Sequence, residues 1–486
     1  MNENESINSI KKKSLTGFMW RLGEGVVAEG MTFIVGMILA RLLLPEEFGL
    51  VALSGLVLAV VNVFADCGLG QALIQKKTAD DLDSNTVFYA GLMISIVLSV
   101  ILYLIAPFLG ELFDQPAVIP LIRVSSLILL FSSYNSVQTA EISRALDFKK
   151  FFYVGIISSF VSGAVGISMA LSHMGVWALI AQRLSYTITK TVTLNRIITW
   201  SPKLQFSIDR FRSLFSYGIK LMASGVIGMI FNQMKGFLIG IKYQPSDLSF
   251  YNRGESLPSV LCNNINGTVN QIMLPALSKL QDNPELMKSG LRRSMMLSSF
   301  FLFPMMFGLV ATSDNIITIL FSDMWSASVP FLQVISIGYC FQILSSANLM
   351  AINAIGRSDV SLKLEFIKKP IFLILLIIGV NISPLAIAMA VAINSIFAMM
   401  INAWPNRKLI HYSLSEQWKD IYPQFLIAIF MGILVYIVGL LNINIYVLIL
   451  LQILLGIIVY IGLAKLFKLE AYIYVVRTIR EFMGKS

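Results

Sequence analysis

The chain has 486 residues, of which 56% are hydrophobic and only 13% are charged, and its mean hydropathy is +0.77. These values exclude a soluble globular protein and predict an all-α polytopic membrane protein. A formal net charge of +10 is also found in nucleic-acid-binding proteins, but these gather their cations on one exposed face. Membrane topology explains the cations better here, and we expect no nucleic-acid partner.

The N-terminal residues MNENESINSIKKKS contain three lysines but no apolar stretch with a small-residue cleavage site. We therefore expect no cleaved signal peptide and a cytoplasmic N-terminus. The three cysteines are far apart in sequence, and His173 and His411 stand alone. This spacing favours neither a disulfide framework nor a metal centre, and it offers no His-based catalytic group. We expect no cofactor, no metal and no enzymatic activity.

About fourteen segments are apolar and long enough to cross roughly 30 Å of hydrocarbon, which takes about twenty residues. The predicted spans, in chain order, are 15–41, 48–75, 84–108, 119–143, 151–172, 175–197, 214–241, 248–279, 291–312, 328–355, 361–381, 384–404, 421–440 and 444–467.

An even number of spans with the N-terminus inside places both termini in the cytoplasm. Most of the 37 Lys and Arg residues then lie in or beside cytoplasmic segments, as the positive-inside rule requires. The tail 469–486 alternates basic and apolar residues, which is typical of an interfacial amphipathic helix on the cytoplasmic leaflet.

A short pattern occurs twice in the chain. ILARLLLPEEFGL (38–50) and LIGIKYQPSDLSF (238–250) both place a cation near the end of one apolar helix, followed by a proline and a polar or acidic pair. We expect each proline in the first turn of the next helix and each acidic pair at its cap. The repeat predicts two six-helix lobes around a central cavity, residues 1–200 and 201–412, with two additional helices in 413–468.

The eighth predicted span carries polar residues at steps of three and four, which place them on one helix face. Amides and charges on a lipid-facing surface are costly, so this face must meet protein or water. Other spans add charged and polar residues. The candidate cavity residues are Arg21, Glu24, Asp66, Gln71, Arg183, Lys235, Arg253, Glu255, Asn263, Asn266 and Asn270.

Two interpretations of these residues stay open. Asparagine and serine side chains are often interhelical contacts that contribute only about 0.6 kcal/mol each, and Arg21 and Glu24, three residues apart, can neutralise each other. Charged residues inside a membrane, in contrast, generally mark solvated pathways. Coupling of transport to a proton or sodium gradient would need a carboxylate, for which Asp66, Glu24 and Glu29 are the candidates.

The stretch FADCGLGQALIQKK (64–77) ends the second span. Asp66 lies about ten residues before Lys76, or roughly 15 Å inside the membrane at 1.5 Å per residue. It shares a helix face with Asn62, and Gly68 and Gly70 permit a bend or close helix packing just after it. We expect Asp66 to face the cavity; the alternative is a buried contact with a neighbouring helix.

Six stretches together resemble the polysaccharide transporter family, the Wzx-like oligosaccharide flippases of the multidrug/oligosaccharidyl-lipid/polysaccharide exporter superfamily, and among them the colanic acid and teichuronic acid exporters. These are ARLLLPEEFGLVALS (40–54), DCGLGQALIQKK (66–77), TAEISRALDFKK (139–150), GVWALIAQRLS (175–185), YNRGESLP (251–258) and LPALSKLQDN (274–283). This chain has Cys67 where the family commonly has phenylalanine.

The resemblance implies a monomeric exporter in the bacterial inner membrane that moves an undecaprenyl-diphosphate-linked oligosaccharide outward by alternating access, for surface polysaccharides such as lipopolysaccharide or capsule. Its partners would be this lipid-linked substrate, membrane lipids and the polysaccharide polymerase machinery. Arg21, Lys235 and Arg253 would attract the diphosphate, and the asparagines would bind sugar hydroxyls. The alternatives are a multidrug-type exporter of the same fold and a membrane-embedded glycan-modifying enzyme.

Overall fold

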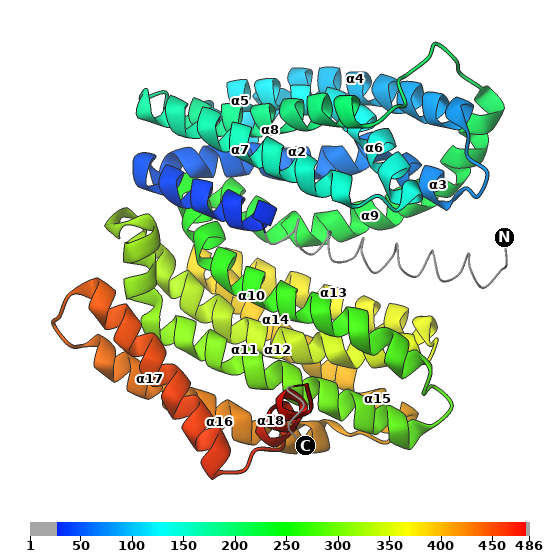
Figure 1. The fold of residues 1–486 in the computed structure, drawn as a ribbon. Helices are drawn as coiled ribbons and strands as arrows, with labels where there is room; N and C mark the ends of the chain where they lie inside the picture. The colour runs from blue at the N-terminus through cyan, green and yellow to red at the C-terminus, as the bar shows by residue number, and fades with distance from the viewer. Residues whose placement is uncertain (1–26, 483–486) are drawn as a thin grey trace. The chain divides into compact units, whose positions relative to one another are not determined.

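Helices account for all the regular structure in residues 27–482, the part of the chain that the computed structural model describes. These residues form two compact units, of which one ends at Ser249 and the other begins at Phe250. Figure 1 shows the helices of both units in chain order. The predicted all-α class is therefore confirmed for the described residues.

The first unit is a bundle in which α7 packs on α8, α4 on α6, and α2 on α9. A helix over 27–42 precedes this bundle. The other helices are α2 (Pro45–Asp66), α3 (Leu69–Gln75), α4 (Asp81–Leu112), α5 (Val118–Ser125), α6 (Leu127–Ala145), α7 (Lys149–Leu171), α8 (Val176–Ile197) and α9 (Ile208–Lys242). One face of α4 exposes large apolar side chains, including Met93, Val97, Leu104 and Phe108, as expected for a surface in contact with lipid.

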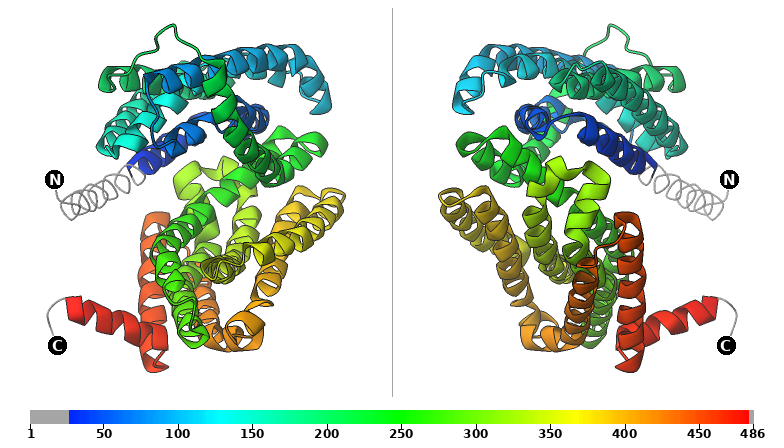
Figure 2. Two further views of the ribbon diagram at one scale, coloured as in Figure 1. Left: turned by 90° about the vertical axis from the view of Figure 1, so that its right-hand side faces the viewer. Right: turned by 90° about the vertical axis from the view of Figure 1, so that its left-hand side faces the viewer.

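The second unit packs α12 on α14 and α11 on both α12 and α16. In Figure 2, α16 and α17 lie side by side and α18 leaves them at an angle. Its elements are α10 (Pro245–Ser278, from Phe250 onward), α11 (Pro284–Phe321), the 3-10 helix η1 (Asp323–Ser328), α12 (Val329–Ala354), α13 (Ser358–Val380), α14 (Pro384–Ala403), α15 (Asn406–Leu409), α16 (Leu414–Gly439), α17 (Ile445–Leu466) and α18 (Glu470–Phe482).

Ten helices among the described residues are long and apolar enough to cross a membrane, and each coincides with a predicted span. Three more predicted spans, at α8, α10 and α13, are helices of spanning length that carry charged residues. The first predicted span, 15–41, lies partly outside the described residues. The multi-pass architecture is confirmed, and the number fourteen stays a prediction.

The second and fourth predicted spans are each divided in two. The span predicted over 48–75 consists of α2 and α3, because Cys67 and Gly68 have φ values of 46° and 64° and so leave the right-handed helical region. The predicted span 119–143 consists of α5 and α6, which join at Ser126.

The repeated turn has the predicted geometry in both copies. Pro45 and Pro245 are the first residues of α2 and α10. Glu47 accepts a hydrogen bond from the Leu44 N–H at 2.8 Å, and Asp247 accepts one from the Gln244 N–H at 3.1 Å. These carboxylates cap the helices as expected from the sequence.

The two turns also contact each other in a reciprocal way. The Ser249 hydroxyl donates to the carbonyl of Pro45, while a Cβ on Gly49 would collide with the carbonyl of Pro245. Residue 49 is equivalent to 249, and residue 45 to 245. This exchange is the contact expected between two copies of one motif related by a pseudo-twofold axis.

The first compact unit extends beyond the predicted lobe boundary at residue 200, because α9 packs on α2, α3 and α4. The assignment of residues 1–200 and 201–412 to two lobes around a central cavity stays a prediction. The predicted amphipathic tail over 469–486 includes α18.

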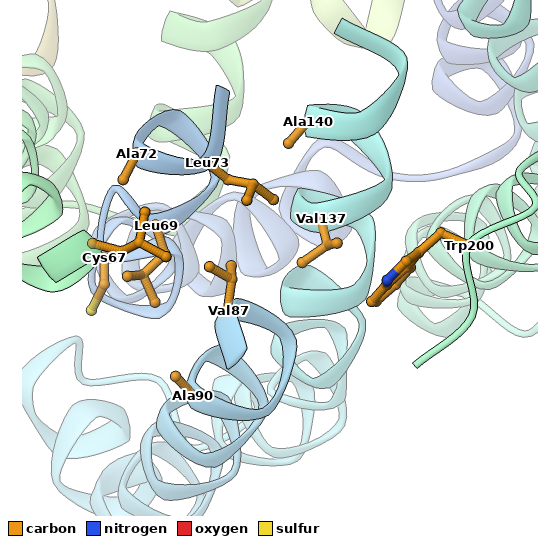
Figure 3. Close-up of a cluster of buried hydrophobic side chains, with 10 residues drawn as sticks. Cys67, Leu69, Ala72, Leu73, Val87, Ala90, Val137, Ala140 and Trp200 are labelled. Atoms are coloured by element: carbon orange, nitrogen blue, oxygen red, sulfur yellow. The ribbon is translucent and has the colours of Figure 1, made fainter. Parts of the chain in front are cut away.

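A hydrophobic cluster fixes α3 against α4 and α6. In Figure 3, Val87 of α4 lies between Leu69 of α3 and Val137 of α6, and Trp200 lies on the far side of Val137. These side chains are at most 8% exposed, and full burial of one such side chain contributes roughly 1.5–3 kcal/mol. The cluster thus holds the short helix α3, and the break before it, in a fixed position.

An ionic cluster closes the same bundle at the end where α4 and α9 begin. The Asp83 side chain is fully buried and accepts hydrogen bonds from Lys76 at 2.6 and 2.7 Å and from Arg210 at 3.0 Å. Arg210 also binds Asp80 at 3.2 Å. A buried carboxylate needs such partners, because desolvation of an unpaired charge is costly.

We predict that Asp83→Asn lowers the stability of the protein by about 2 kcal/mol, since hydrogen bonds to charged groups contribute roughly 1.5–3 kcal/mol. Asp81→Asn is the matched control. Asp81 forms an ion pair with Lys203, but the side chains are 66% and 60% exposed, respectively, so the pair should contribute little to stability. Thermal unfolding in detergent measures both variants. Equal midpoints for the two variants would contradict the role assigned to Asp83.

Candidate functional site

The first unit contains a polar hollow of about 750 Å³ between α2, α3, α6, α8 and α9. Its lining combines a carboxylate, an ammonium group, amides and hydroxyls with a few apolar side chains. We call it the polar hollow; the polar side chains that line it are Asn62, Asp66, Gln71, Ser132, Asn135, Ser136, Thr139, Tyr186, Thr187 and Lys190.

Asp66 lies at the last residue of α2, where the helix breaks. Its Oδ1 accepts a hydrogen bond from the Ser136 hydroxyl of α6 at 2.8 Å. Gly70 leaves the space for this bond, because a Cβ there would collide with the Ser136 oxygen. Asp66 thus lines the polar hollow and also contacts a neighbouring helix; that it faces a central cavity stays a prediction.

The break itself depends on two glycines that meet. A Cβ on Gly68 would lie 2.6 Å from the carbonyl oxygen of Gly218 in α9. Gly68 also has a positive φ of 64°, which glycine adopts without steric cost. The bend predicted from Gly68 and Gly70 is confirmed, and it lets α9 cross α2 and α3 at close range.

Hydroxyl and amide pairs join the helices around the hollow. Ser132 donates to Asn62 at 3.0 Å, and Thr191 donates to Asn135 at 3.0 Å. Each pair satisfies one bond of the groups involved, while asparagine and serine can make more. The remaining donors and acceptors are available to water or a polar ligand in the hollow.

Lys190 is the cation of the polar hollow, and the sequence analysis does not single it out. With Tyr186 and Thr187 it forms a polar stripe at helical spacing on α8. The sequence YTITK (186–190) contains a pattern that indicates this polar face, because its polar residues recur within about one helical turn. A cation next to the C-terminal half of a span, however, is also typical of a helix end at the membrane surface.

Of three other predicted residues of the first unit, one lines the hollow and two do not. Gln71 lines it. Arg183 of α8 instead donates to the Val51 carbonyl of α2 at 3.3 Å and does not line the hollow. Lys235 is half-buried on α9, beside Gly236, where α9 packs against Leu56.

The predicted residues of α10 belong to the second unit. The Arg253 guanidinium lies 4.4 Å from the ring centre of Phe321 and 4.6 Å from that of Trp325. The two aromatic faces attract the guanidinium through their ring quadrupoles. Trp325 is fully buried, so the position of Arg253 is well defined.

The other predicted polar residues on this face of α10 are Glu255, Asn263, Asn266 and Asn270, and two of them are exposed. Tyr339 donates to Glu255 at 3.4 Å, and Asn266 donates to the Cys262 sulfur at 3.5 Å. Asn263 and Asn270 are exposed on the helix surface. An exposed amide face on a spanning helix is expected to contact water, protein or a polar ligand rather than lipid.

Arg21 and Glu24 lie outside the described residues, and Glu29 is exposed on the helix over 27–42. Within residues 27–482, no group of three or more His, Cys, Asp or Glu side chains is arranged to hold a metal ion. The cysteines are free and buried.

Comparison with known proteins places these observations in a family. The model of a family described as "Polysaccharide biosynthesis protein" matches residues 38–330. The chain is 23% identical over 401 residues to the lipopolysaccharide biosynthesis protein WzxC of Escherichia coli (strain K12), covering 81% of this chain and 80% of that protein. It is 23% identical over 442 residues to the teichuronic acid biosynthesis protein TuaB of Bacillus subtilis (strain 168), covering 89% and 90%.

Two solved structures share the fold. The lipid II flippase MurJ in an inward closed conformation matches with a TM-score of 0.72 and 18% identity, over 91% of this chain and 98% of that one. An inward-facing multidrug resistance MATE family transporter of the MOP superfamily matches with a TM-score of 0.63 and 13% identity, over 81% and 98%. At these identities the similarity establishes the fold.

We predict that Gly68→Ala destabilises the first unit, because a left-handed conformation costs a non-glycine residue about 1–2 kcal/mol and the new Cβ meets the Gly218 carbonyl. Gly228→Ala in α9 is the control: a Cβ there meets no atom within 4 Å, and alanine favours a helix. Thermal unfolding should show a lower midpoint for the first variant only. A Gly68→Ala protein as stable as the Gly228→Ala protein would contradict the observed packing.

Proposed function

We propose that this chain, which belongs to the polysaccharide biosynthesis protein family, is a flippase that moves undecaprenyl-diphosphate-linked oligosaccharide repeat units across the bacterial cytoplasmic membrane. The family is one of membrane transporters rather than enzymes. The biosynthetic roles printed in the names of the two relatives, for lipopolysaccharide and teichuronic acid, support a surface polysaccharide as the end product.

The observation that carries the proposal is the polar hollow inside a bundle of membrane-spanning helices. A glycan carries many hydroxyl groups, which lose their water on entering the membrane and need other partners. The amides and hydroxyls on α2, α6 and α8 offer such donors and acceptors. The volume of about 750 Å³ lies within the range of 300–1,000 Å³ that is usual for ligand sites.

The diphosphate needs fixed positive charge, and Arg253 supplies it in the second unit. Its two aromatic neighbours fix the orientation of the guanidinium on the spanning helix α10. An arginine binds phosphate oxygens through paired N–H donors. Lys190 and Lys235 are further cations on membrane-spanning helices of the first unit.

The cations also support the proposed orientation. Lys76, Arg144, Lys203 and Arg210 gather at the end of the first unit where α4 and α9 begin. The positive-inside rule assigns this end to the cytoplasm. Both termini would then be cytoplasmic.

Energy coupling through a carboxylate is a further part of the proposal. Asp66 is the carboxylate that lines the polar hollow, and its hydrogen bond to Ser136 leaves its second oxygen for a proton or a sodium ion. Equal transport by the wild type and by Asp66→Asn from pH 6 to pH 8 would exclude this role.

Transport of a fluorescent polyprenyl-diphosphate oligosaccharide in proteoliposomes tests the proposal. We predict that Arg253→Gln lowers the rate of flipping by about tenfold or more, because a hydrogen bond to a charged group contributes roughly 1.5–3 kcal/mol, whereas Arg253→Lys keeps part of the activity. Arg123→Gln is the matched control, since Arg123 also stacks on an aromatic ring, 4.6 Å from the centre of Tyr103.

A second substrate separates function from folding. The wild type and the Arg253→Gln variant should flip a polyprenyl glycan that lacks the diphosphate at the same rate. Loss of flipping for both substrates together with a lower unfolding midpoint would assign Arg253 a structural role. If the Arg253→Gln variant flipped the diphosphate substrate at the rate of the wild type, the proposed role of Arg253 would be overturned.

A further inference from the structure

The second unit contains a pocket of about 690 Å³ where α16, α17 and α18 meet α11. One end of the pocket is charged and the other is apolar. The charged rim holds Arg292, Lys419, Asp420, Lys468 and Glu470, and the apolar wall holds Leu426, Ile427, Phe430, Leu463 and Phe467. The proposed flippase activity does not use this pocket.

The two carboxylates of the rim are already bound by one arginine. Arg292 of α11 forms a two-pronged ion pair with Glu470 of α18 at 2.8 and 2.6 Å, and its Nε binds Asp420 of α16 at 2.9 Å. Tyr412 also donates to Asp420 at 2.7 Å. The contact fixes the beginning of α18 against α11 and α16.

The two lysines of the rim are not held in ion pairs with the described residues. Among residues 27–482, neither Lys419 nor Lys468 has an acidic side chain within 4.0 Å. Both are exposed. Because Asp420 and Glu470 both bind Arg292, the five charged side chains of the rim have a net charge of +1, and the two lysines are the cations that face an anion.

A buried hydrogen-bond acceptor lies between the rim and the apolar wall. Gln424 lines the pocket and is 2% exposed, and its Oε1 accepts no hydrogen bond in the structure. A buried acceptor without a donor costs roughly 1–3 kcal/mol. Pro423, next to it, has no N–H for the Lys419 carbonyl one turn earlier, so a second acceptor lies beside the lysines. A ligand with hydroxyl groups would satisfy both.

The apolar wall continues along the membrane-facing side of α16 and α17. Leu426 is 44% exposed, Phe430 is 50% exposed and Phe467 is 65% exposed. Exposed apolar side chains next to a polar headgroup site are typical of contact with acyl chains. A free phosphate would meet the lysines but would leave this wall uncovered.

We propose that this pocket binds one anionic phospholipid whose headgroup carries hydroxyl groups, of the phosphatidylglycerol class. The phosphate binds Lys419 and Lys468, the glycerol hydroxyls donate toward Gln424 and the Lys419 carbonyl, and the acyl chains lie along Phe430 and Leu463. An ethanolamine headgroup fits less well, because its ammonium group would lie beside two lysines. The lipid would join α16 and α17 to α18 at the end of the helices that the positive-inside rule assigns to the cytoplasm.

Native mass spectrometry of the full-length protein, delipidated in detergent and then mixed with defined lipids, tests the proposal. We expect the wild type to retain phosphatidylglycerol at least about fivefold better than phosphatidylethanolamine. The double variant Lys419→Gln/Lys468→Gln should lose this preference. Lys465→Gln is the matched control, because Lys465 is exposed at the same end of α17 but does not line the pocket.

The apolar wall is tested separately. Phe430→Ala should weaken phosphatidylglycerol retention, while Ile433→Ala should not, since both side chains are about half exposed on α16 and only Phe430 lines the pocket. Glycerol 1-phosphate, which has the headgroup without acyl chains, should neither bind at the same concentration nor raise the unfolding midpoint.

The proposal would be overturned if the wild type retained the two lipids equally. It would also be overturned if Lys465→Gln lost the preference for phosphatidylglycerol as fully as the double variant, or if glycerol 1-phosphate bound as tightly as the lipid. Because Lys419, Lys468 and Phe430 are exposed, their variants are expected to fold, and unchanged unfolding midpoints without lipid would establish this. The result does not depend on which glycan the protein transports.

Discussion

The contact between Gly68 and Gly218 is the constraint on which the architecture of the first unit depends. The two backbones approach so closely that no side chain fits between them. At this point α2 ends, α3 begins in a new direction and α9 crosses both. A broken helix in a membrane is tolerated only where protein or water satisfies its free backbone groups. The hydrophobic cluster around Val87 and the ionic cluster around Asp83 hold the helices on either side of the break.

The break also determines the chemistry of the polar hollow. Asp66 is the last residue before it, and the redirected α3 brings Gly70 and Gln71 to the same hollow. Helices α6 and α8 then face this region mainly with amides, hydroxyls and Lys190, and Ile128 is their one apolar side chain among the described residues of the lining. A membrane protein uses such a set of polar groups where a hydrated substrate or ion passes.

Much of the fold follows from patterns in the sequence, and the family predicted from six short stretches is confirmed. Hydropathy located the spans, and Pro45 and Pro245 located two helix starts, because both signals depend on local physical chemistry. Gly68 and Gly70 predict a bend after Asp66, but not the full division into two helices at Cys67, since cysteine has no special preference for positive φ and an apolar run has the same hydropathy in one helix or in two. Lys190 and Ser136 were missed as site residues because their importance depends on which helices pack together. Arg21 and Glu24 lie outside the described residues, so their predicted place in the cavity stays a prediction.

Reaction of single cysteines with a charged, membrane-impermeant thiol reagent is the most direct test that the hollow holds water within the membrane. In a protein without Cys67, Cys262 and Cys340, Ser132→Cys in the hollow is compared with Leu104→Cys, which is 69% exposed on the apolar face of α4. The thiolate forms in water and not in lipid, so the account predicts labelling of Ser132→Cys at least about tenfold faster. Equally slow labelling at the two positions, in variants that still fold, would contradict it.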